Sequence, residues 1–422
     1  MILILSLLVL MFLGIPIVFC LGLSSAIYLL VTDLKPLTII AQRTMYGMDS
    51  FVLLAVPMFI LSGYIMEHGG LSRRLVDWVE KIFGHFQGAS GTITIVCCAI
   101  FAALTGSGPA TVAAIGAVMM PALINSGYPR HISSGMLAAG GALGPIIPPS
   151  VAMIVYGSTM NVSIPKMFIG GIIPGIFIVV LFIIVNYVIS ARLGIKGSNT
   201  RYTLKEIVLS TWRASGILML PVIVLGGIYS GIFTPTEAAT VCVVYSVALG
   251  FIFKELSFKG LLDSFKRTIV TSATIATIIG ISSVFGWILA AAKIPSTIAA
   301  SLVPLLGNST IYMLALMLVL FVVGCLMECL AAIVILAPIL TPIGLVLGVD
   351  PLHLGVVFCI NLVVGFITPP FGINLFTAVS TTGVPYTDVV RGAVPFIVVA
   401  VIAVFIFAFV PEFILFLPRM LG

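Results

Sequence analysis

Charged residues are scarce in this chain of 422 residues. Lysine and arginine together number 19, aspartate and glutamate 13, and charged side chains make up 8% of the sequence, against about a quarter in an ordinary soluble domain. Residues 1–32 and 294–327 carry no charge at all, and runs of that length exceed the about 20 residues that cross a bilayer core. The composition excludes a soluble globular domain and predicts a membrane protein built of α-helices, because a helix satisfies its own backbone in lipid.

The residues that catalytic and metal sites require are also few. The four histidines, His68, His85, His131 and His353, lie near the ends of expected helices, and no aspartate lies inside a charge-free run, which argues against an intramembrane hydrolase. The seven cysteines lie in apolar runs without a CxxC pair, so we interpret them as small buried residues. The net charge of +6 is spread over short loops without a long basic tract, which excludes nucleic-acid binding.

Helix-breaking residues, in contrast, are concentrated within the apolar sequence. The stretches GALGPIIPPS (141–150) and VVGFITPPFG (363–372) each contain a proline pair. Proline lacks the backbone N–H and clashes with the preceding turn, and it also restricts the residue before it. We therefore expect a helix to unwind at each stretch. Irregular backbone at membrane depth is tolerated only where it is buried or lines a wet cavity.

The two proline pairs belong to a longer internal similarity. They lie 221 residues apart, and other prolines and glycines match at the same offset, namely Pro121 with Pro342, Gly144 with Gly365, Gly171 with Gly392, and Pro174 with Pro395. Chance is the weaker explanation, so the spacing predicts a duplicated half.

Each half is expected to contain the same series of elements. In the first half we expect helices near 1–31 and 51–67, an amphipathic arm at 71–86, an apolar segment interrupted at 105–111, a broken helix at 132–160 and a helix at 168–190. In the second half we expect helices at 236–253 and 272–290, a short stretch near 294–306, a segment interrupted at 324–332, a broken helix at 354–380 and a helix at 393–417. A helix at 214–231 joins the halves. The predicted fold is an all-α polytopic membrane protein with an inverted repeat, two re-entrant helical hairpins and two broken transmembrane helices.

The basic residues predict the orientation of this fold. If the interrupted segments are re-entrant hairpins, the two halves have opposite orientations. With the N-terminus in the cytoplasm and the C-terminus in the periplasm, the loops 68–91, 125–131, 191–213, 254–267 and 382–392 are cytoplasmic and hold 14 of the 19 lysines and arginines. This bias agrees with the positive-inside rule.

Paired broken helices in an inverted repeat are the strongest sequence indication of a transport site. The tip TGSGPAT (105–111) offers three hydroxyls, although small residues there also suit close helix packing. The 221-residue offset aligns Glu328 with Ser107, and an acid at membrane depth is either functional or a hydrogen-bonded structural carboxyl. Asn361 and Asn374 flank the second break and suit coordination or interhelical hydrogen bonds. Glu237, in Thr-Pro-Thr-Glu, is expected to cap a helix.

The motifs GSGPATVAAIGAVMMPA, GALGPIIPPS, GIFTPTEAA, LAPILTPIG and NLVVGFITPPFGINLF occur in this order along the chain. They resemble the large membrane subunit of tripartite ATP-independent periplasmic (TRAP) transporters. The resemblance implies a sodium-driven, elevator-type importer of organic acids in a bacterial inner membrane, in the class of C4-dicarboxylate or sialic acid carriers. It also implies at least two Na⁺ ions, a small four-helix membrane subunit and a periplasmic substrate-binding protein. Because the chain begins at the large subunit's first helix, we expect the small subunit to be a separate polypeptide.

The resemblance also assigns site residues. It implies a first sodium site at Gly106, Ser107, Gly108, Gly141, Gly144 and Pro148, and a second at Gly324, Met327, Glu328, Gly365, Thr368 and Pro369. Candidate substrate contacts are Ser107, Pro109, Ser150, Asn361 and Asn374. The first tip lacks a second serine before its proline, and the second lacks the proline and threonine often found after the acid, so the ligands at both tips remain open.

The position of these sites predicts which segments move during transport and which stay fixed. The segments 92–160 and 310–380 would form the moving transport unit, while 1–91, 161–309 and 381–422 would form the scaffold. An ion channel, which would want a filter motif such as TVGYG, and a non-transporting scaffold subunit are the alternatives. We do not expect an enzyme.

Overall fold

The structure is a computed structural model that describes residues 2–197 and 202–421, and every regular element in those residues is a helix. Nine of the described helices are long and apolar enough to cross a membrane. The prediction of an all-α polytopic membrane protein is therefore confirmed.

From the hairpins onward, the helices of the two predicted halves follow a similar order, while the helices that precede the hairpins differ in number. The first half contains α1 (Ile2–Phe12), α2 (Ile17–Thr32), α3 (Thr38–Met48), η1 (Phe51–Leu54), α4 (Ala55–His68), α5 (Leu71–Phe83), α6 (Ala89–Thr105), α7 (Gly108–Asn125), α8 (Arg130–Ala142), α9 (Val151–Met160) and α10 (Ile164–Leu193). After α11 (Leu204–Tyr229), the second half contains α12 (Pro235–Ile252), α13 (Phe258–Ala291), α14 (Ile294–Leu306), α15 (Ser309–Leu326), α16 (Cys329–Val346), α17 (Pro351–Gly365), α18 (Ile373–Thr382), α19 (Tyr386–Phe409) and α20 (Glu412–Leu421). Both ends of α7 and α16 are 221 residues apart, as the sequence spacing predicts.

The N-terminal region differs from the prediction. The single helix expected over 1–31 is wrong, because α1 and α2 are separated by a turn at Gly14, whose φ is +75°, and α2 begins only after Pro16. Proline has no N–H to continue a helix, and glycine tolerates positive φ, so the pair stops one helix and starts another. The helix α3 was not predicted from the sequence.

Two further boundaries are corrected. The helix expected at 272–290 begins earlier, at Phe258, and so includes a charged segment that was expected to be a loop. Ser257 caps this start, because its hydroxyl accepts a hydrogen bond from the Gly260 N–H at 3.0 Å. The helix expected over 393–417 is two helices, since the chain breaks at Val410 and Pro411 between α19 and α20.

Two helix starts have the same capping chemistry. In α12 the Thr234 side chain accepts from the Glu237 N–H, while the Glu237 carboxylate accepts from the Thr234 N–H at 2.8 Å. The capping role predicted for Glu237 is confirmed. Thr203 and Glu206 form the same box in α11, which moves the start of that helix ahead of the predicted residue 214.

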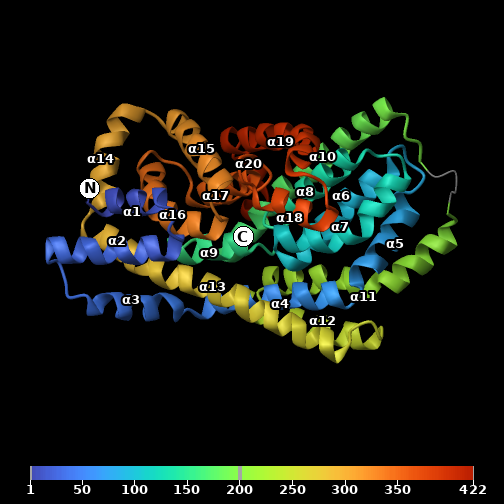
Figure 1. Ribbon diagram of the computed structural model, residues 1–422, viewed down its shortest axis with the longest axis horizontal. Helices are drawn as coiled ribbons and strands as arrows, with labels where there is room; N and C mark the ends of the chain where they lie inside the picture. Colours follow the sequence, from blue (N-terminus) through green and yellow to red (C-terminus); the bar gives the residue numbers. More distant parts are fainter. Residues whose placement is uncertain (1, 198–201, 422) are drawn as a thin grey trace.

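The hairpins and broken helices occupy the middle of the molecule, and the two halves interlock there (Figure 1). The pair α6–α7 contacts α8 of its own half and α18 of the other half, which packs on α7. The pair α15–α16 likewise contacts α17, and its helix α16 packs on α9 of the first half. Each hairpin is thus held by broken helices from both halves, so the candidate site is shared between them.

The helices that follow the broken helices pack tightly on this central group. A methyl group on Gly135 of α8 would lie 2.1 Å from the Gly392 carbonyl carbon of α19, so the two backbones touch. Asn186 of α10 donates to the Gly88 carbonyl at 2.9 Å and to Thr92 at 3.1 Å, beside α6. Both α10 and α19 are therefore tied to the hairpins and broken helices.

The N-terminal helices form a separate apolar cluster at one end of the molecule, near α14 (Figure 1). Leu3, Leu21, Phe285 and Ile288 are among its buried residues, which come from α1, α2 and α13. At the other end, the arm α5 packs on α6 and α11, and the Trp78 indole N–H donates to Thr211 at 2.9 Å. All seven cysteines are free and buried, as the sequence predicts.

Candidate functional site

A cavity of about 350 Å³ lies where the two hairpin tips and the two breaks face the helices α4 and α13. The hairpins and breaks contribute Thr105, Gly106, Ser107, Gly108, Pro109, Ala110, Pro145, Val151, Ala152, Glu328, Cys329, Leu330, Phe366 and Ile373; α4 and α13 contribute Ile60, Gly63, Tyr64, Val270, Thr271, Thr274, Ile275 and Ile278. Glu328 is the only charged residue of this lining. The remaining polar groups are hydroxyls and backbone atoms.

The first tip is a two-residue turn between α6 and α7. Gly106 has φ +59°, which favours glycine, and Ser107 is extended and precedes α7. The Ser107 carbonyl accepts hydrogen bonds from the Thr111 N–H at 3.2 Å and from the Thr111 hydroxyl at 2.8 Å. Within the described part of the chain, the Ser107 hydroxyl has no partner and α7 has no side-chain cap. Ser107 and the first residues of α7, Gly108, Pro109 and Ala110, line the cavity.

The first break (143–150) rests directly on this tip. A methyl group on Gly144 would lie 2.7 Å from the Ser107 carbonyl, and one on Gly106 would lie 2.8 Å from the Pro149 carbonyl oxygen. The break is buried, including Pro148. Ser150 is buried and is not among the residues that line the cavity. Its hydroxyl donates to the Pro145 carbonyl and accepts from the Met153 N–H at 3.3 Å, so it caps α9.

The second tip differs in chemistry. Glu328 precedes α16, and its carboxylate accepts from the Leu330 N–H at 2.8 Å and the Ala331 N–H at 3.1 Å. The side chain thus caps α16, which stabilises the N-terminal end of a helix dipole. Met327 is half-buried beside it. Glu328 lies at the cavity wall, as a functional acid would, while also making structural hydrogen bonds.

The second break (366–372) is more open than the first. Gly365 approaches Gly324, where a methyl group on Gly365 would lie 2.2 Å from the carbonyl carbon. The Thr368 hydroxyl donates to the Val364 carbonyl at 2.8 Å, and Pro369 is exposed. The second break therefore contacts α15 of the hairpin at Gly324, which lies before the tip itself. Both breaks contain a cis proline peptide, Pro148–Pro149 in the first and Pro369–Pro370 in the second.

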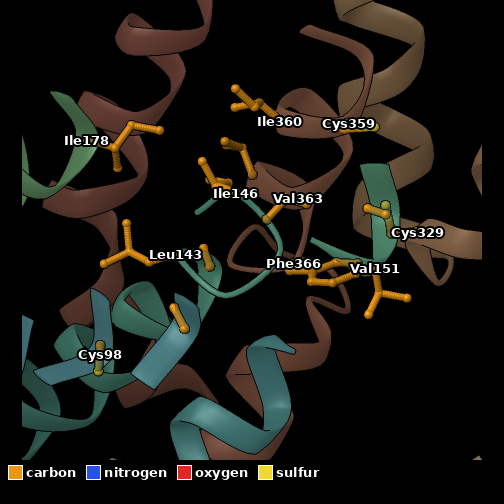
Figure 2. Packing of buried hydrophobic residues seen from close by; sticks show 14 of the residues in the cluster. Cys98, Leu143, Ile146, Val151, Ile178, Cys329, Cys359, Ile360, Val363 and Phe366 are labelled. Atoms are coloured by element: carbon orange, nitrogen blue, oxygen red, sulfur yellow. The ribbon is translucent and has the colours of Figure 1, made fainter. Parts of the chain in front are cut away.

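The two breaks meet in one buried core. Figure 2 shows Ile146 and Val151 of the first break region near Val363 and Phe366 of the second, with Cys329 of the second tip beside them. Ser107 and Glu328, which belong to the predicted sites of the two halves, line the same cavity.

Asn374, which belongs to the second half, reaches the first site. A methyl group on Gly108 would lie 2.6 Å from the Asn374 Oδ1, and one on Gly141 would lie 3.0 Å from its Nδ2. The side chain is fully buried, and neither amide atom has a hydrogen-bond partner among the described residues. An unpaired buried amide costs stability, so the Asn374 amide has unused hydrogen-bonding capacity beside the first tip.

Asn361, the other predicted asparagine, lies elsewhere. Its amide donates to the Met317 carbonyl at 2.9 Å, and it lines a separate cavity of about 130 Å³ between α15, α17 and α19. The structure does not bring Asn361 together with Ser107 and Pro109. Of the two roles open from the sequence, its contacts are those of an interhelical hydrogen bond.

The polar lining from α4 and α13 was missed by sequence reasoning. The Tyr64 hydroxyl lies 3.3 Å from the Thr271 hydroxyl, and Thr274 is one turn further along α13. The spacing of the two threonines by three residues places them on one helix face, which was the available signal.

The donor set of the site favours a hard cation held by oxygen. In residues 2–197 and 202–421 there is no group of three or more histidine, cysteine, aspartate or glutamate side chains able to hold a metal. The oxygen atoms available at the tips and breaks are hydroxyls, carbonyls and one carboxylate. Freed carbonyls and half-helix ends of this kind coordinate Na⁺ in transporters.

Comparison with known proteins agrees with this architecture. The large permease protein DctM of the C4-dicarboxylate TRAP transporter of Pseudomonas aeruginosa is 39% identical over 95% of this chain and 94% of its own length. The sialic acid TRAP transporter large permease protein SiaM of Vibrio cholerae is 33% identical over 97% of this chain and 96% of its own length. The isethionate TRAP transporter permease protein DctMQ of Oleidesulfovibrio alaskensis is 39% identical over 94% of this chain, but the chain spans only 63% of that protein.

Among solved structures, the YdaH transporter of Alcanivorax borkumensis matches with a TM-score of 0.62 at 13% identity, covering 88% of this chain and 86% of that one. This likeness concerns the fold alone. The model of the family described as "Tripartite ATP-independent periplasmic transporter, DctM component" matches residues 4–413. The relatives named above are transporter permeases, not enzymes. The chain therefore belongs to the DctM component of the tripartite ATP-independent periplasmic transporters, a family of membrane transporters with many spans.

Proposed function

We propose that this chain is the sodium-coupled importer of an organic acid, working by an elevator movement. The observation that carries the proposal is the cavity of about 350 Å³, which has both hairpin tips on one side and α4 and α13 on the other. A substrate held there contacts the site residues of both halves. It also contacts α4 and α13, the helices against which the moving unit would slide.

The substrate would be an acid because the cavity presents the uncapped N-terminus of α7. That helix has no side-chain cap, and Gly108 and Ala110, whose N–H groups lie in its first turn, line the cavity. Free N–H groups at a helix start attract carboxylates. The similarity to permeases named for C4-dicarboxylate and for sialic acid supports these two classes.

Sodium, the coupling ion, would bind beside the substrate. At the first site we assign the Ser107 hydroxyl, carbonyls of the break near Gly144, and Asn374. At the second we assign the backbone around Met327 and Thr368, together with Glu328. The supporting observations are the free Ser107 hydroxyl and the unpaired Asn374 amide in the described residues. Loading cations next to the acid would offset its charge.

The moving unit would include more of the chain than 92–160 and 310–380. The backbone contact of Gly135 with Gly392 and the buried bonds of Asn186 tie α19 and α10 to the hairpins and broken helices. We therefore propose that α6–α10 and α15–α19 move as one body. The helices α1–α4 and α11–α13, with the arms α5 and α14, would remain fixed. Most buried residues of the N-terminal cluster come from α1, α2 and α13, while Ile335 of α16 packs on it across the proposed boundary.

The orientation would follow the charge distribution. The loops 68–91, 125–131, 191–213, 254–267 and 382–392, which hold 14 of the 19 basic residues, would lie in the cytoplasm of a bacterium, with the protein in its inner membrane. The N-terminus would then be cytoplasmic and the C-terminus periplasmic, with the halves inverted and the hairpins re-entrant from opposite faces. Labelling of single cysteines at Lys196 and Gly348 from each side would test this.

The transporter would work with partners, as the family's tripartite description implies. We propose a separate small four-helix membrane subunit and a periplasmic substrate-binding protein that delivers the acid. Uptake by proteoliposomes should therefore require all three proteins, and full uptake by this chain alone would contradict the tripartite part of the proposal.

The sodium assignment is tested with Ser107→Ala in the reconstituted system. One lost ligand should raise the sodium concentration for half-maximal uptake about tenfold or more. Ser126→Ala, remote from the cavity, is the matched control. An unchanged sodium response in Ser107→Ala would argue against the first site.

A crosslink tests the elevator. A methyl group on Gly63 of α4 would lie 3.1 Å from the Thr105 Cβ, so the double variant Gly63→Cys/Thr105→Cys should form a disulfide between fixed and moving parts and abolish uptake. In the control, Gly140→Cys would meet the native Cys98, since its Cβ would lie 2.6 Å from the Cys98 Sγ. That bond lies within the moving unit and should leave uptake intact. Reduction of the disulfide should restore uptake by Gly63→Cys/Thr105→Cys. Uptake by the oxidised form of this variant would contradict the elevator movement.

A further inference from the structure

An open cleft of about 310 Å³ lies at the far end of α8 from the candidate site. It is lined by Arg130, His131, Gly383, Val384, Pro385, Asp388 and Arg391. The 13 residues of α8 separate its first residue from the first break by about 18 Å at the ordinary helical rise. The cleft is therefore distinct from the cavity at the hairpin tips.

The fold brings the first turns of α8 and α19 together at this cleft. A methyl group on Gly392 would lie 1.8 Å from the His131 carbonyl oxygen, and Gly135 faces the same backbone. Side chains larger than hydrogen would hold the two helices apart. The close crossing thus places Arg130 and Arg391, from opposite halves of the chain, on one cleft.

The cleft has an excess of positive groups. Considering the residues that the structure describes, neither Arg130 nor Arg391 forms an ion pair, and the side chain of Asp388, the one carboxylate in the lining, forms none either. The helix starts add to this. Pro129 and Pro385 occupy the capping positions of α8 and α19, and neither helix has a side-chain cap. Two guanidinium groups and two uncapped N-termini all favour an anion.

The start of α17, which matches the start of α8 at the 221-residue offset, shows that such a helix can begin without an arginine. At the 221-residue offset, Arg130 and Arg391 correspond to Pro351 and Gly170. There α17 is capped from within the chain, because the Asp350 carboxylate accepts from the Leu352 and His353 N–H groups at 2.9 Å. The start of α17 thus has its own carboxylate cap, whereas α8 begins with Pro129 and Arg130 and has no cap, and the one carboxylate of the cleft, Asp388 in the first turn of α19, caps neither helix.

We propose that the cleft of Arg130 and Arg391 binds one anionic group, a phosphate or a similar oxyanion, between α8 and α19. Arginine suits this chemistry because its planar guanidinium holds two oxygens of one anion. The phosphate has two sources, a lipid headgroup or a free ion. In either case it would join the first turns of two helices from opposite halves.

The test uses the full-length protein purified in neutral detergent. Phosphate is titrated at constant ionic strength, and the concentration giving half of the thermal stabilisation is recorded. Arg130→Gln and Arg391→Gln should each raise that concentration about tenfold. Asp388→Asn should lower it several-fold, because a repelling charge is removed. Arg192→Gln, an exposed arginine in the last turn of α10, should match the wild type.

A second arm separates the two sources. The same variants are incubated with phosphatidylglycerol or phosphatidylcholine, and retained lipid is counted by native mass spectrometry. Stabilisation by inorganic phosphate that is lost in the arginine variants indicates a site open to free ions. Selective retention of phosphatidylglycerol without a phosphate response indicates a headgroup site. The proposal is overturned if neither probe distinguishes the wild type from Arg130→Gln/Arg391→Gln.

Discussion

The two halves place different chemistry at equivalent positions. Ser107 precedes α7 and leaves that helix uncapped, whereas Glu328, 221 residues later, caps α16 with its own carboxylate. An uncapped start is available to a ligand, and a capped one is already satisfied. The first half therefore has an uncapped helix start at the cavity, while the second half contributes a carboxyl group.

The contacts between hairpin and break also differ. Gly144 meets Ser107 at the first tip, but its counterpart Gly365 meets Gly324, four residues before Glu328 and thus about one helical turn from the tip. The first break is buried, whereas Pro369 and Phe371 of the second are exposed, Phe371 at 55%. The two matched segments thus differ, because the first break is buried against its tip and the second break is more exposed.

The largest effect is expected from filling the glycine contacts. Gly144→Ala and Gly365→Ala would place a methyl group 2.7 Å from the Ser107 carbonyl and 2.2 Å from the Gly324 carbonyl carbon. Each should lower the free energy of unfolding by about 1–3 kcal/mol and abolish uptake. Thermal unfolding in detergent and uptake by proteoliposomes measure the two effects.

The matched control is Gly226→Ala, since nothing lies within 4 Å of the added methyl group. It should be neutral or stabilising by up to about 1 kcal/mol in the last turn of α11. If Gly144→Ala behaves like this control, the first tip is not closed by backbone contact.

The next effect distinguishes a ligand from a structural amide. Asn186 is fully paired, because it donates to Gly88 and Thr92 and accepts from the Tyr128 hydroxyl at 2.7 Å. Asn186→Leu should therefore cost about 1–3 kcal/mol of stability. Asn374→Leu removes an amide without partners, so it should leave stability unchanged or higher while the sodium response is lost.

Both variants are measured by thermal unfolding, and Asn374→Leu also by uptake at varied sodium. A loss of stability in Asn374→Leu comparable to that of Asn186→Leu would instead indicate a structural role at the crossing of the two halves.

Two substitutions at Glu328 separate the role of its acidic group from its role as the cap of α16. Glu328→Ala loses both, and the lost cap should cost about 1 kcal/mol. Glu328→Gln keeps an oxygen that accepts from the Leu330 and Ala331 N–H groups, so its stability should stay near that of the wild type while sodium-dependent uptake falls. Normal uptake by Glu328→Gln would show that the carboxylate serves the helix alone.

The smallest effect is expected at the arm of the first half. Arg74 of α5 pairs with Glu255 at 2.6 Å and lies over the Phe253 ring at 4.0 Å, but the paired side chains are about one third exposed, 33% and 32%. Arg74→Gln should lower stability by about 1 kcal/mol or less. A larger loss on thermal unfolding would mean that the arm depends on this contact.

The sequence by itself determined the class of fold and the places where it breaks. Scarce charge and long apolar runs require membrane helices, and the prolines of 141–150 and 363–372 must interrupt them wherever they lie, because these are local properties of the backbone. The helix cap at Glu237 followed for the same reason. The 221-residue spacing likewise predicted that α7 and α16 would match end to end.

Only the tertiary structure decided which of these residues meet. Asn361 and Asn374 flank the same break, yet one bonds to α15 and the other reaches Gly108 of the first half. The cavity wall from α4 and α13, the backbone crossing at Gly135 and Gly392, and the cleft of Arg130 and Arg391 all join residues far apart in the chain. Such contacts depend on how the helices cross. A local sequence pattern fixes the helix and its breaks, but it does not determine which residue of the other half lies opposite.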